Sequence, residues 1–500
     1  MMKYAPTIGL EIHAELKTKS KMFCDSKNDP NETRPNQNVC PVCLAHPGTL
    51  PTINKQAVEH VIRVGLALGG KINPVSKFDR KNYFYPDLPK GYQISQYDQP
   101  LVFGGMLQGV RIRRIHLEED TGRLLHESRV KGHESSLVDF NRAGVPLMEL
   151  VTEPDITSPE QASAFARELQ LILRYLNVSD ADMELGQMRV EANVSIQDPR
   201  WKFKEEPKSG VSLWIFSGDG SKEVPLNDRV ELKNINSFRA MEDAVRYELK
   251  RHEEVLEAGG VISQETRGWD EAKQKSVVQR TKEDAHDYRY FPEPDLPPFE
   301  TSFFDLEKLK NGLPELPAEK RERFANEYGL NEIQAATIVG EPALANYFEE
   351  AVSELKGKNP MASVLTLFNY LTSDIRGLVN ERGIILQDTK VNPEHLAHLV
   401  FLIESGKLTS RQAKDMLAKM FMRDEDPEDI LADESMYAIS DSIELETIAQ
   451  LILQENPNAV EDYRKGKTAS LQFLIGKSMA KLKGKGNPEI LKEILLKLLK

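Results

Sequence analysis

Within the first 200 residues, acidic side chains recur in four short segments. In each segment polar and apolar residues alternate, as they do in a β-strand with one buried face. Because successive side chains of a strand point to opposite faces of a sheet, Glu11, His13 and Glu15 share one face, and Glu149 and Glu153 are likewise in phase. Carboxylates crowded onto one face repel one another unless a cation lies among them. An oxygen-rich set of ligands suits Mg²⁺, the ion that accompanies nucleotide phosphates. The pattern therefore predicts phosphoryl-transfer chemistry on an antiparallel sheet. The four segments are residues 9–15, 115–120, 146–153 and 188–194.

The size and composition of the chain limit its class. Its 500 residues are enough for two or three domains, and 40% hydrophobic with 29% charged residues is ordinary for a soluble globular protein. Three cysteines are too few for a disulfide framework, so we expect a cytoplasmic protein. The net charge of −13 argues against general coating of nucleic acid. Residues 461–500, however, hold ten Lys or Arg and four acidic residues, a local +6 that could hold a polyanion or simply form a solvated helix face.

The pattern of apolar and polar residues along the sequence changes near residue 291. Before it, short alternating runs separated by turn residues predict strands, interrupted by helices at 55–68, 159–176 and 239–257. Residues 291–299 contain four prolines, which neither a helix nor a central strand accommodates, and almost everything beyond them has helical periodicity. We therefore expect an α+β protein. Its predicted parts are an antiparallel-sheet cradle domain over residues 1–293, a helical domain over 294–405 and a small helical tail domain over 406–500.

Several longer strings are too specific to arise from composition. Together with the acidic segments they resemble the B subunit of the aspartyl/glutamyl-tRNA(Asn/Gln) amidotransferase, and the resemblance runs essentially from end to end. The strings are residues 77–96, 136–146, 231–238, 283–295 and 464–488. The resemblance implies that ATP phosphorylates the side-chain carboxylate of glutamate or aspartate on a misacylated tRNA. Ammonia from glutamine, released by a partner amidase subunit, then displaces the phosphate. A small C subunit would be the third chain, and the tail would bind tRNA.

The resemblance also assigns the metal site. Strict alternation would instead place Glu118 in phase with His116, and the residues alone do not choose between Glu118 and Glu119. Because Mg²⁺ prefers oxygen, His13 would either support the site indirectly or favour Mn²⁺. The implied Mg²⁺ ligands, which are also the implied catalytic residues, are Glu11, His13, Glu119, Glu149 and Glu191.

Basic and aromatic residues within the same strings are candidate ligands for phosphate and tRNA. The sequence has no P-loop and no Rossmann fingerprint, so ATP would lie on the sheet itself, by analogy with glutamine-synthetase-like sites. The candidate phosphate ligands are Arg142, Lys233 and Arg289, each of which alone would usually be a surface ion-pair member. The candidate acceptor-strand residues are Lys81, Asn82, Tyr83, Tyr85, Lys90 and Gln93, although the aromatic residues could equally be buried core.

The three cysteines form a second candidate metal site. Cys40 and Cys43 have zinc-knuckle spacing, and Cys24 lies far enough upstream to join them. Many proteins of the family that this chain resembles have a fourth cysteine two positions after the first, where this chain has Ser26. Asp25 or His46 could complete a structural zinc site, and the alternative is three free thiols.

Two other classes of protein compete with this interpretation. A non-catalytic tRNA-binding adaptor would tolerate changes to the acidic residues and would show no ATPase activity stimulated by Glu-tRNA. An ATP-dependent ligase for a free amino acid would not need the basic tail. The sequence does not choose between Glu-tRNA and Asp-tRNA, and no Ser-x-x-Lys arrangement identifies an amidase nucleophile in this chain.

Overall fold

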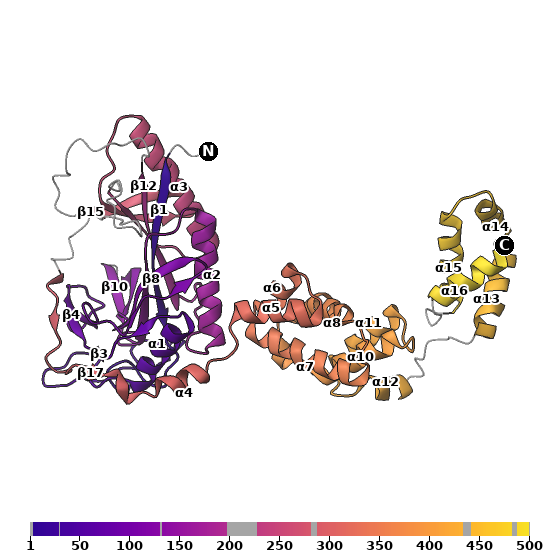
Figure 1. The fold of residues 1–500 in the computed structure, drawn as a ribbon, viewed down its shortest axis with the longest axis horizontal. Coiled ribbons are helices and arrows are strands. Elements are labelled where there is room, and N and C mark those ends of the chain that lie inside the picture. The colour runs from indigo at the N-terminus through magenta and orange to yellow at the C-terminus, as the bar shows by residue number, and fades with distance from the viewer. Residues whose placement is uncertain are drawn as a thin grey trace. The chain divides into compact units, whose positions relative to one another are not determined.

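The computed structural model describes residues 4–29, 31–130, 133–197, 228–281, 288–433, 442–482 and 488–499. The chain forms two compact units, Met1–Pro317 and Ala318–Lys500 (Figure 1). The first unit combines a large sheet with helices and the second is helical, so the mixed α/β character predicted from the sequence is confirmed. Residues 283–287 and 483–487 of the sequence strings described above lie outside the described residues. No described helix is both long enough and apolar enough to cross a lipid bilayer.

A ten-stranded sheet forms the framework of the first unit. The main path runs β15-β14-β13-β12-β1-β11-β8-β6-β2, with β7 beside β8, and every neighbouring pair is antiparallel except β13 and β14. Strand β1 lies between β11 and β12, which follow it by more than 130 residues in the chain. The strands are β1 (Ala5–Glu15), β2 (Lys71–Ile72), β6 (Val102–Phe103), β7 (Met106–Leu107), β8 (Val110–Glu119), β11 (Pro146–Thr152), β12 (Met188–Gln197), β13 (Val230–Lys233), β14 (Glu265–Asp270) and β15 (Lys275–Thr281).

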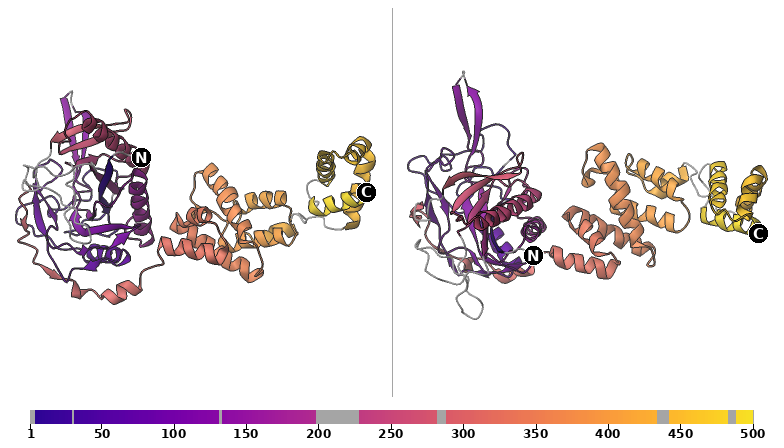
Figure 2. Two further views of the ribbon diagram at one scale, coloured as in Figure 1. Left: turned by 45° about the horizontal axis from the view of Figure 1, so that its top comes forward. Right: turned by 90° about the horizontal axis from the view of Figure 1, so that it is seen from above.

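Three helices cover the apolar face of this sheet: α1 (Lys55–Ala67), α2 (Pro159–Tyr175) and α3 (Phe238–Glu257). Their N-caps are side chains that accept a hydrogen bond from the first turn, Asn54, Ser158 and Ser237 respectively. Helices α2 and α3 lie side by side (Figures 1 and 2), and together with α1 they bury the alternate residues Leu10 and Ile12 of β1. The opposite, polar face of β1 is left for the acidic side chains. The helices predicted at these three places are confirmed.

Short strands attach the proline-rich segment to the first unit. Strand β16 (Phe291–Pro292) pairs with β4 (Asp79–Asn82), which pairs with β5 (Tyr92–Ser95), and β17 (Phe299–Glu300) pairs with β3 (Val75–Ser76). Arg80 donates two hydrogen bonds of 2.7 Å to the buried carboxylate of Glu293. The proline-rich segment is therefore part of the compact unit Met1–Pro317. A separate hairpin consists of β9 (Arg123–Val130) and β10 (His133–Asp139), and α4 (Leu306–Asn311) precedes the end of the unit.

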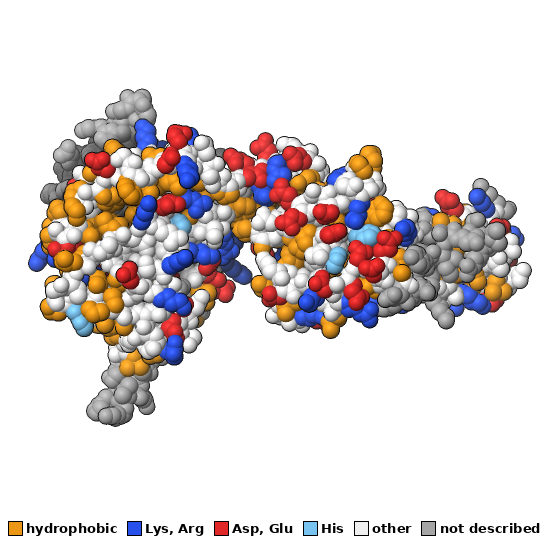
Figure 3. Space-filling model, turned by 90° about the horizontal axis from the view of Figure 1, so that it is seen from below, with side chains coloured by type: hydrophobic (Ala, Val, Ile, Leu, Met, Phe, Trp, Pro, Cys, Tyr) orange, Lys and Arg blue, Asp and Glu red, His pale blue; other side chains and the backbone are white. Residues whose placement is uncertain are grey.

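The described part of the second unit contains helices and helical turns only, as predicted. Helix α10 contacts α7, α8, α11 and α12, and α13 to α16 contact one another around small apolar clusters of their own. On the face shown in Figure 3, acidic and basic side chains are interspersed over residues 318–433 and form no single basic surface. The helices are α5 (Pro317–Tyr328), α6 (Glu332–Val339), α7 (Pro342–Lys358), α8 (Val364–Asn369), α9 (Arg376–Arg382), α10 (Pro393–Glu404), α11 (Ser410–Met420), α12 (Pro427–Asp433), α13 (Ser442–Glu455), α14 (Pro457–Arg464), α15 (Ala469–Lys481) and α16 (Pro488–Leu499).

Candidate active site

The strand register brings titratable side chains from five neighbouring strands onto one face of the sheet. His13 of β1 stands opposite Glu149 of β11, which in turn stands opposite His116 of β8. Glu11 stands opposite Glu191 of β12. We call the resulting group the carboxylate cluster; its members are Glu11, His13, His116, Glu118, Glu149, Glu191 and Glu231.

Ligand atoms in the carboxylate cluster are close enough to share cations. His13 Nε2 lies 3.4 Å from Glu149 Oε2, 3.5 Å from Glu118 Oε1 and 3.8 Å from Glu11 Oε1. Three overlapping trios each have ligand atoms within 4.8 Å of one another. The trios are Glu11–His13–Glu149, His116–Glu118–Glu149 and Glu11–Glu191–Glu231. The structure thus brings together four of the five residues predicted as metal ligands, Glu11, His13, Glu149 and Glu191, and adds neighbours that were not assigned.

The electrostatics of the cluster show how strongly it favours positive charge. Burial and the charge of Glu149 raise the pKa of Glu11 to about 7. Burial alone would lower the pKa of His13, but its hydrogen bond to Glu149 and the charges of Glu149, Glu118 and Glu11 outweigh burial and raise that pKa to about 9. Burial also opposes ionisation of Glu149, yet the two histidines hold its pKa well below the usual range. The raised pKa values of Glu11 and His13 thus both reflect the crowding of carboxylates in the cluster.

Glu119, the residue that the resemblance assigns to the metal site, has its contacts outside the carboxylate cluster. Adjacent residues of β8 face opposite sides, and it is Glu118 that points at His13. The carboxylate of Glu119 accepts hydrogen bonds from Lys90 at 2.6 Å and from the backbone N–H of Ile94 at 2.9 Å, away from the cluster. Glu118 and His116 are thus in phase on β8, as strict alternation gives.

Only one of the three predicted phosphate ligands contacts the cluster. Lys233 Nζ lies 2.7 Å from Glu191 and 3.7 Å from Glu231. Arg142 donates to the carbonyl oxygens of Thr121 and Gly122 and lies 3.4 Å from Asp120, at another place in the unit. Arg289 has a left-handed backbone conformation, with φ of 45°, and an exposed side chain.

The residues predicted to bind the acceptor strand of tRNA divide into two groups. Burial alone would lower the pKa of Lys81, but the negative charges of Glu118 and Glu149 outweigh burial and raise that pKa well above its ordinary value. Its ammonium also lies 5.2 Å from the centre of the Tyr288 ring. Gln93, by contrast, is buried and donates to the carbonyl oxygen of Glu119 at 2.6 Å, and Lys90 pairs with the Glu119 carboxylate.

The aromatic loop between β4 and β5 is accessible. Phe84 is 86% exposed and Tyr85 is also exposed, so neither belongs to a buried core. Tyr83 packs edge-on against both Tyr85 and Tyr288, with ring centres 6.0 Å apart in each pair. Asn82 Nδ2 donates to the carbonyl oxygens of Tyr288 and Arg289, and these bonds tie the loop to the chain segment that follows residue 287.

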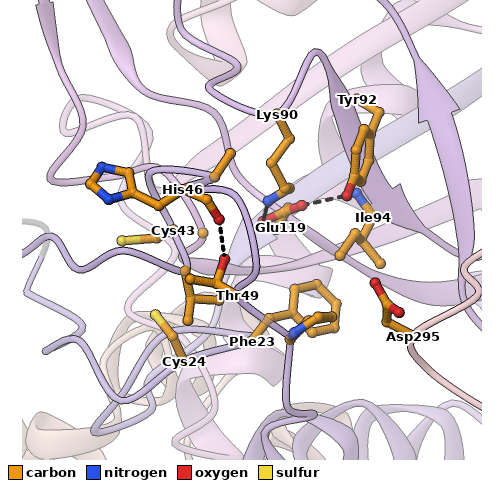
Figure 4. Close-up of a pocket in the computed structure, with 14 residues that line it drawn as sticks. Phe23, Cys24, Cys43, His46, Thr49, Lys90, Tyr92, Ile94, Glu119 and Asp295 are labelled. Atoms are coloured by element: carbon orange, nitrogen blue, oxygen red, sulfur yellow. Dashed lines mark hydrogen bonds and ion pairs between the residues drawn. The ribbon is translucent and has the colours of Figure 1, made fainter.

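The three cysteines converge at a separate place. Their sulfur atoms lie within 4.8 Å of one another, and among the described residues neither Asp25 nor His46 adds a ligand atom to this group. Figure 4 shows Cys24 and Cys43 lining a cavity of about 180 Å³ that also contains Glu119 and Lys90. A hydrogen bond with Cys24 and the charge of Lys21 lower the pKa of the Cys43 thiol to about 4.

Three contributors were missed from the sequence. His116 carried a signal, because it is in phase with Glu118 on a strand that was predicted. Glu231 begins one of the strings but has no acidic neighbour in phase within β13. Lys21 had no signal at all, since its place beside Cys43 follows only from the tertiary fold.

Comparison with known sequences is consistent with this site. Residues 6–304 match the profile of the family described as the GatB/GatE catalytic domain, and residues 346–499 match the GatB domain. The chain therefore belongs to the amidotransferase B-subunit family. It is similar to the B subunit of the aspartyl/glutamyl-tRNA(Asn/Gln) amidotransferase from Dehalococcoides mccartyi strain CBDB1, with 45% identity over 100% of this chain and 99% of that protein. The protein of the same description from Thermomicrobium roseum is also 45% identical, over 99% of this chain and 98% of the relative.

Proposed function

We propose that this chain activates and amidates the side-chain carboxylate of misacylated Glu-tRNA(Gln), Asp-tRNA(Asn) or both, in an ATP-dependent and glutamine-dependent amidotransferase. Its partners are an amidase A subunit, which releases ammonia from glutamine, and a small C subunit, in a cytoplasmic heterotrimer of the translation machinery. The observation that carries the proposal is the carboxylate cluster on the polar face of the central strands. A likeness that covers both units of the chain supports it.

The donor set of the cluster fits Mg²⁺. Its carboxylate oxygens are hard ligands, their mutual repulsion calls for a cation, and no glycine-rich loop competes for the role of phosphate binder. Glu11, Glu118, Glu149 and Glu191 would hold the ion, with His13 in direct contact or in support. When bound, Mg²⁺ stabilises the charge that develops on the transferring phosphoryl oxygens.

The remaining side chains have positioning roles in this proposal. Lys233 and Lys81 supply fixed positive charge at two sides of the cluster, next to Glu191 and near Glu118 respectively. A carboxylate that attacks a phosphoryl group needs orientation and charge neutralisation more than covalent chemistry from the protein. The polar face of the sheet would act as a cradle resembling glutamine synthetase. The exposed Phe84 and Tyr85 would contact the terminal bases of the acceptor strand.

The helical parts would hold the tRNA. We assign residues 1–293 to catalysis, 294–405 to a helical domain and 406–500 to a tRNA-binding tail. The excess of basic residues over 461–500 supports a phosphate-binding role for that tail. The zinc predicted at Cys24, Cys40 and Cys43 would be structural and has no part in the chemistry.

The test is the Glu149→Gln variant, assembled with the amidase and C subunits. The glutamine has nearly the size of the buried Glu149 side chain but lacks its carboxylate, which two trios of the cluster share. We expect ATP hydrolysis stimulated by Glu-tRNA and amidation to fall by about a hundredfold or more, while glutaminase activity of the assembly persists. The control is Glu153→Gln. Glu153 follows the same strand, and its carboxylate pairs with Arg113 outside the cluster.

The same assay distinguishes the alternative. A non-catalytic tRNA-binding adaptor would bind tRNA equally well in both variants and show no ATPase activity stimulated by Glu-tRNA. Near-normal turnover by Glu149→Gln would remove the carboxylate cluster from the chemistry.

A further inference from the structure

Arg189 lies beside the carboxylate cluster, on the strand that carries Glu191. It stands opposite His13 in the register of β1 and β12, and because it precedes Glu191 by two residues, its side chain leaves β12 on the polar face of the sheet. Among the described residues it has one hydrogen-bond partner, the carboxylate of Asp120, at 2.9 Å. A guanidinium has five N–H groups, so most of its donors bind no described residue. The side chain is 40% exposed, and a ligand can reach these donors.

Asp120 fixes the direction of this guanidinium. Its side chain is almost completely buried, and its backbone is hydrogen-bonded through both N–H and C=O to the turn of residues 142–145. One carboxylate oxygen accepts from the backbone N–H of Thr121 at 2.8 Å and from Arg189, and the other lies 3.4 Å from Arg142 Nε. A buried carboxylate with these fixed partners cannot follow a moving arginine, so it holds Arg189 in one orientation.

The carboxylate cluster opposes the approach of a substrate that is itself negative. The proposed function, on which this inference rests, brings the side-chain carboxylate of a glutamyl or aspartyl group close to the carboxylates of the cluster, and like charges repel one another. Lys233 lies 2.7 Å from Glu191 and 3.7 Å from Glu231, so its charge already offsets members of the cluster. The planar fork of an arginine binds a carboxylate through two parallel hydrogen bonds, which offset the charge of the carboxylate and also orient it.

Backbone contacts connect Asp120 to the loop that would receive the acceptor end of tRNA. The next two residues are Thr121 and Gly122, whose carbonyl oxygens accept hydrogen bonds from Arg142 at 3.2 Å and 3.3 Å. The backbone N–H of Gly122 donates to the carbonyl oxygen of Asp87, in the aromatic loop between β4 and β5, at 2.9 Å. The guanidinium that Asp120 holds is therefore directed toward the end of β8 and this loop, and away from β13. A carboxylate that arrives from the aromatic loop would meet this guanidinium beside the cluster.

We propose that Arg189 binds the side-chain carboxylate of the misacylated tRNA, and that Asp120 and Arg142 are positioning residues that hold Arg189 for this contact. In the transfer step, one carboxylate oxygen forms a bond to the γ-phosphorus of ATP, the bond from that phosphorus to the β,γ-bridging oxygen breaks, and ADP leaves. The other carboxylate oxygen stays hydrogen-bonded to the guanidinium. Arg142, a predicted phosphate ligand, then acts on the substrate only through Asp120.

The difference in affinity between Glu-tRNA(Gln) and Gln-tRNA(Gln) isolates this contact, because the two ligands differ only in a carboxylate and the amide that replaces it. Kd values are measured for the assembly with the amidase and C subunits, with Mg²⁺ and without ATP or glutamine, so that no turnover occurs. The pair Asp-tRNA(Asn) and Asn-tRNA(Asn) is measured in the same way. We expect the unaltered chain to bind the acidic form of its substrate at least about tenfold more tightly than the amide form. Arg189→Gln should lower this ratio to about one.

Further variants separate the contact from a general effect of charge. Arg189→Lys keeps the charge but loses the fork, and Asp120→Asn keeps the arginine but loosens its support, so both should lower the ratio part of the way. Arg113→Gln is the matched control and should leave the ratio unchanged. Its side chain is 44% exposed and pairs with Glu153 outside the cluster.

Steady-state amidation with ammonium chloride as nitrogen donor gives a second measurement. Arg189→Gln should lower kcat/KM for the misacylated tRNA by about a hundredfold, because the carboxylate is no longer held for attack. The KM for ATP should stay unchanged, since the arginine contacts the substrate and not the nucleotide.

Several outcomes would overturn the proposal. An unchanged ratio in a folded Arg189→Gln variant would remove the contact, and a raised KM for ATP with an unchanged ratio would assign the arginine to phosphate instead. If thermal unfolding shows that Arg189→Gln does not fold, Arg189→Lys decides, and the ratio of the unaltered chain in that variant would refute the fork. An unchanged ratio in Asp120→Asn would remove its positioning role. Loss of amidation in Glu149→Gln together with an unchanged ratio in Arg189→Gln would refute this contact alone, whereas normal amidation in Glu149→Gln would refute the proposed function.

Discussion

Binding of Mg²⁺ to the carboxylate cluster should release protons, and the number released tests the role of His13. A histidine that ligates a metal must be neutral, whereas the pKa of about 9 keeps His13 protonated at physiological pH in the metal-free chain. The pKa of Glu11, raised to about 7, leaves this carboxyl partly protonated as well. Both groups must lose their protons if both bind the ion.

The magnitude follows from these two values. At pH 7.5, His13 with a pKa of about 9 carries about 0.97 proton, and Glu11 with a pKa of about 7 carries about 0.24 proton. Binding should then release about 1.2 protons. Because His13 and Glu11 are protonated below their raised pKa values, the apparent affinity for Mg²⁺ should increase with pH. The increase should be up to about a hundredfold per unit below about pH 7, where both groups lose a proton, and about tenfold per unit between about pH 7.5 and 8.5, and it should level off above about pH 9.

The assay is isothermal titration calorimetry of the metal-free chain with MgCl₂, in buffers of equal pH and different ionisation enthalpy. The slope of observed enthalpy against buffer enthalpy gives the number of protons released. His13→Gln should leave only the contribution of Glu11. His395→Gln, which removes a histidine from the helical unit, is the control and should release as many protons as the unaltered chain.

Release of about 0.2 proton by the unaltered chain would show that His13 stays protonated and supports the ion from outside its ligand shell. If MgCl₂ produced neither binding heat nor proton release, the cluster would be refuted as a metal site. An affinity that rises as pH falls would contradict the electrostatic reasoning itself.

Three other predictions concern single parts of the molecule. Glu118→Gln should weaken Mg²⁺ binding at least about tenfold, while Glu119→Gln should leave it unchanged, as measured by the same titration; equal effects would contradict the assignment of the two faces of β8. Arg80→Met should destabilise the first unit by about 3–5 kcal/mol, because it leaves the buried carboxylate of Glu293 without its partner. The expected sign is a lower midpoint of the first transition in thermal unfolding, and an unchanged midpoint would show that the pair contributes little. Deleting residues 442–500, the last part of the tail, should raise the KM for tRNA and flatten its dependence on salt; an unchanged KM in steady-state amidation would exclude residues 442–500 as a tRNA-binding element.

Local periodicity predicted much of the site because each strand keeps its alternation when it enters a sheet. Glu11 and His13 were placed on one face before any neighbour of β1 was known, and the structure keeps them there. The same rule puts Glu118, and not Glu119, in phase with His116, and the side chains of Glu118 and Glu119 have this arrangement in the structure.

Pairing partners could not be predicted in this way. Nothing in residues 5–15 indicates that β1 pairs with β11 on one side and β12 on the other, and that arrangement alone joins Glu191 to Glu149 through Glu11. Arg142 shows the same limit. Its string was recognised, but whether the guanidinium meets the cluster or the carbonyl oxygens of residues 121–122 depends on how a loop folds.

The position of β1 between two late neighbours has a consequence for biosynthesis. Strand β1 is synthesised before both of its neighbours, and its second hydrogen-bonding edge remains unpaired until β12, which ends at Gln197, has been made. Until then a nascent polypeptide presents a strand that has one apolar face and an open edge, the kind of segment that chaperones protect from aggregation. The carboxylate cluster therefore assembles only after β12 has been made, although Glu11 and His13 precede Glu191 by a long stretch of chain.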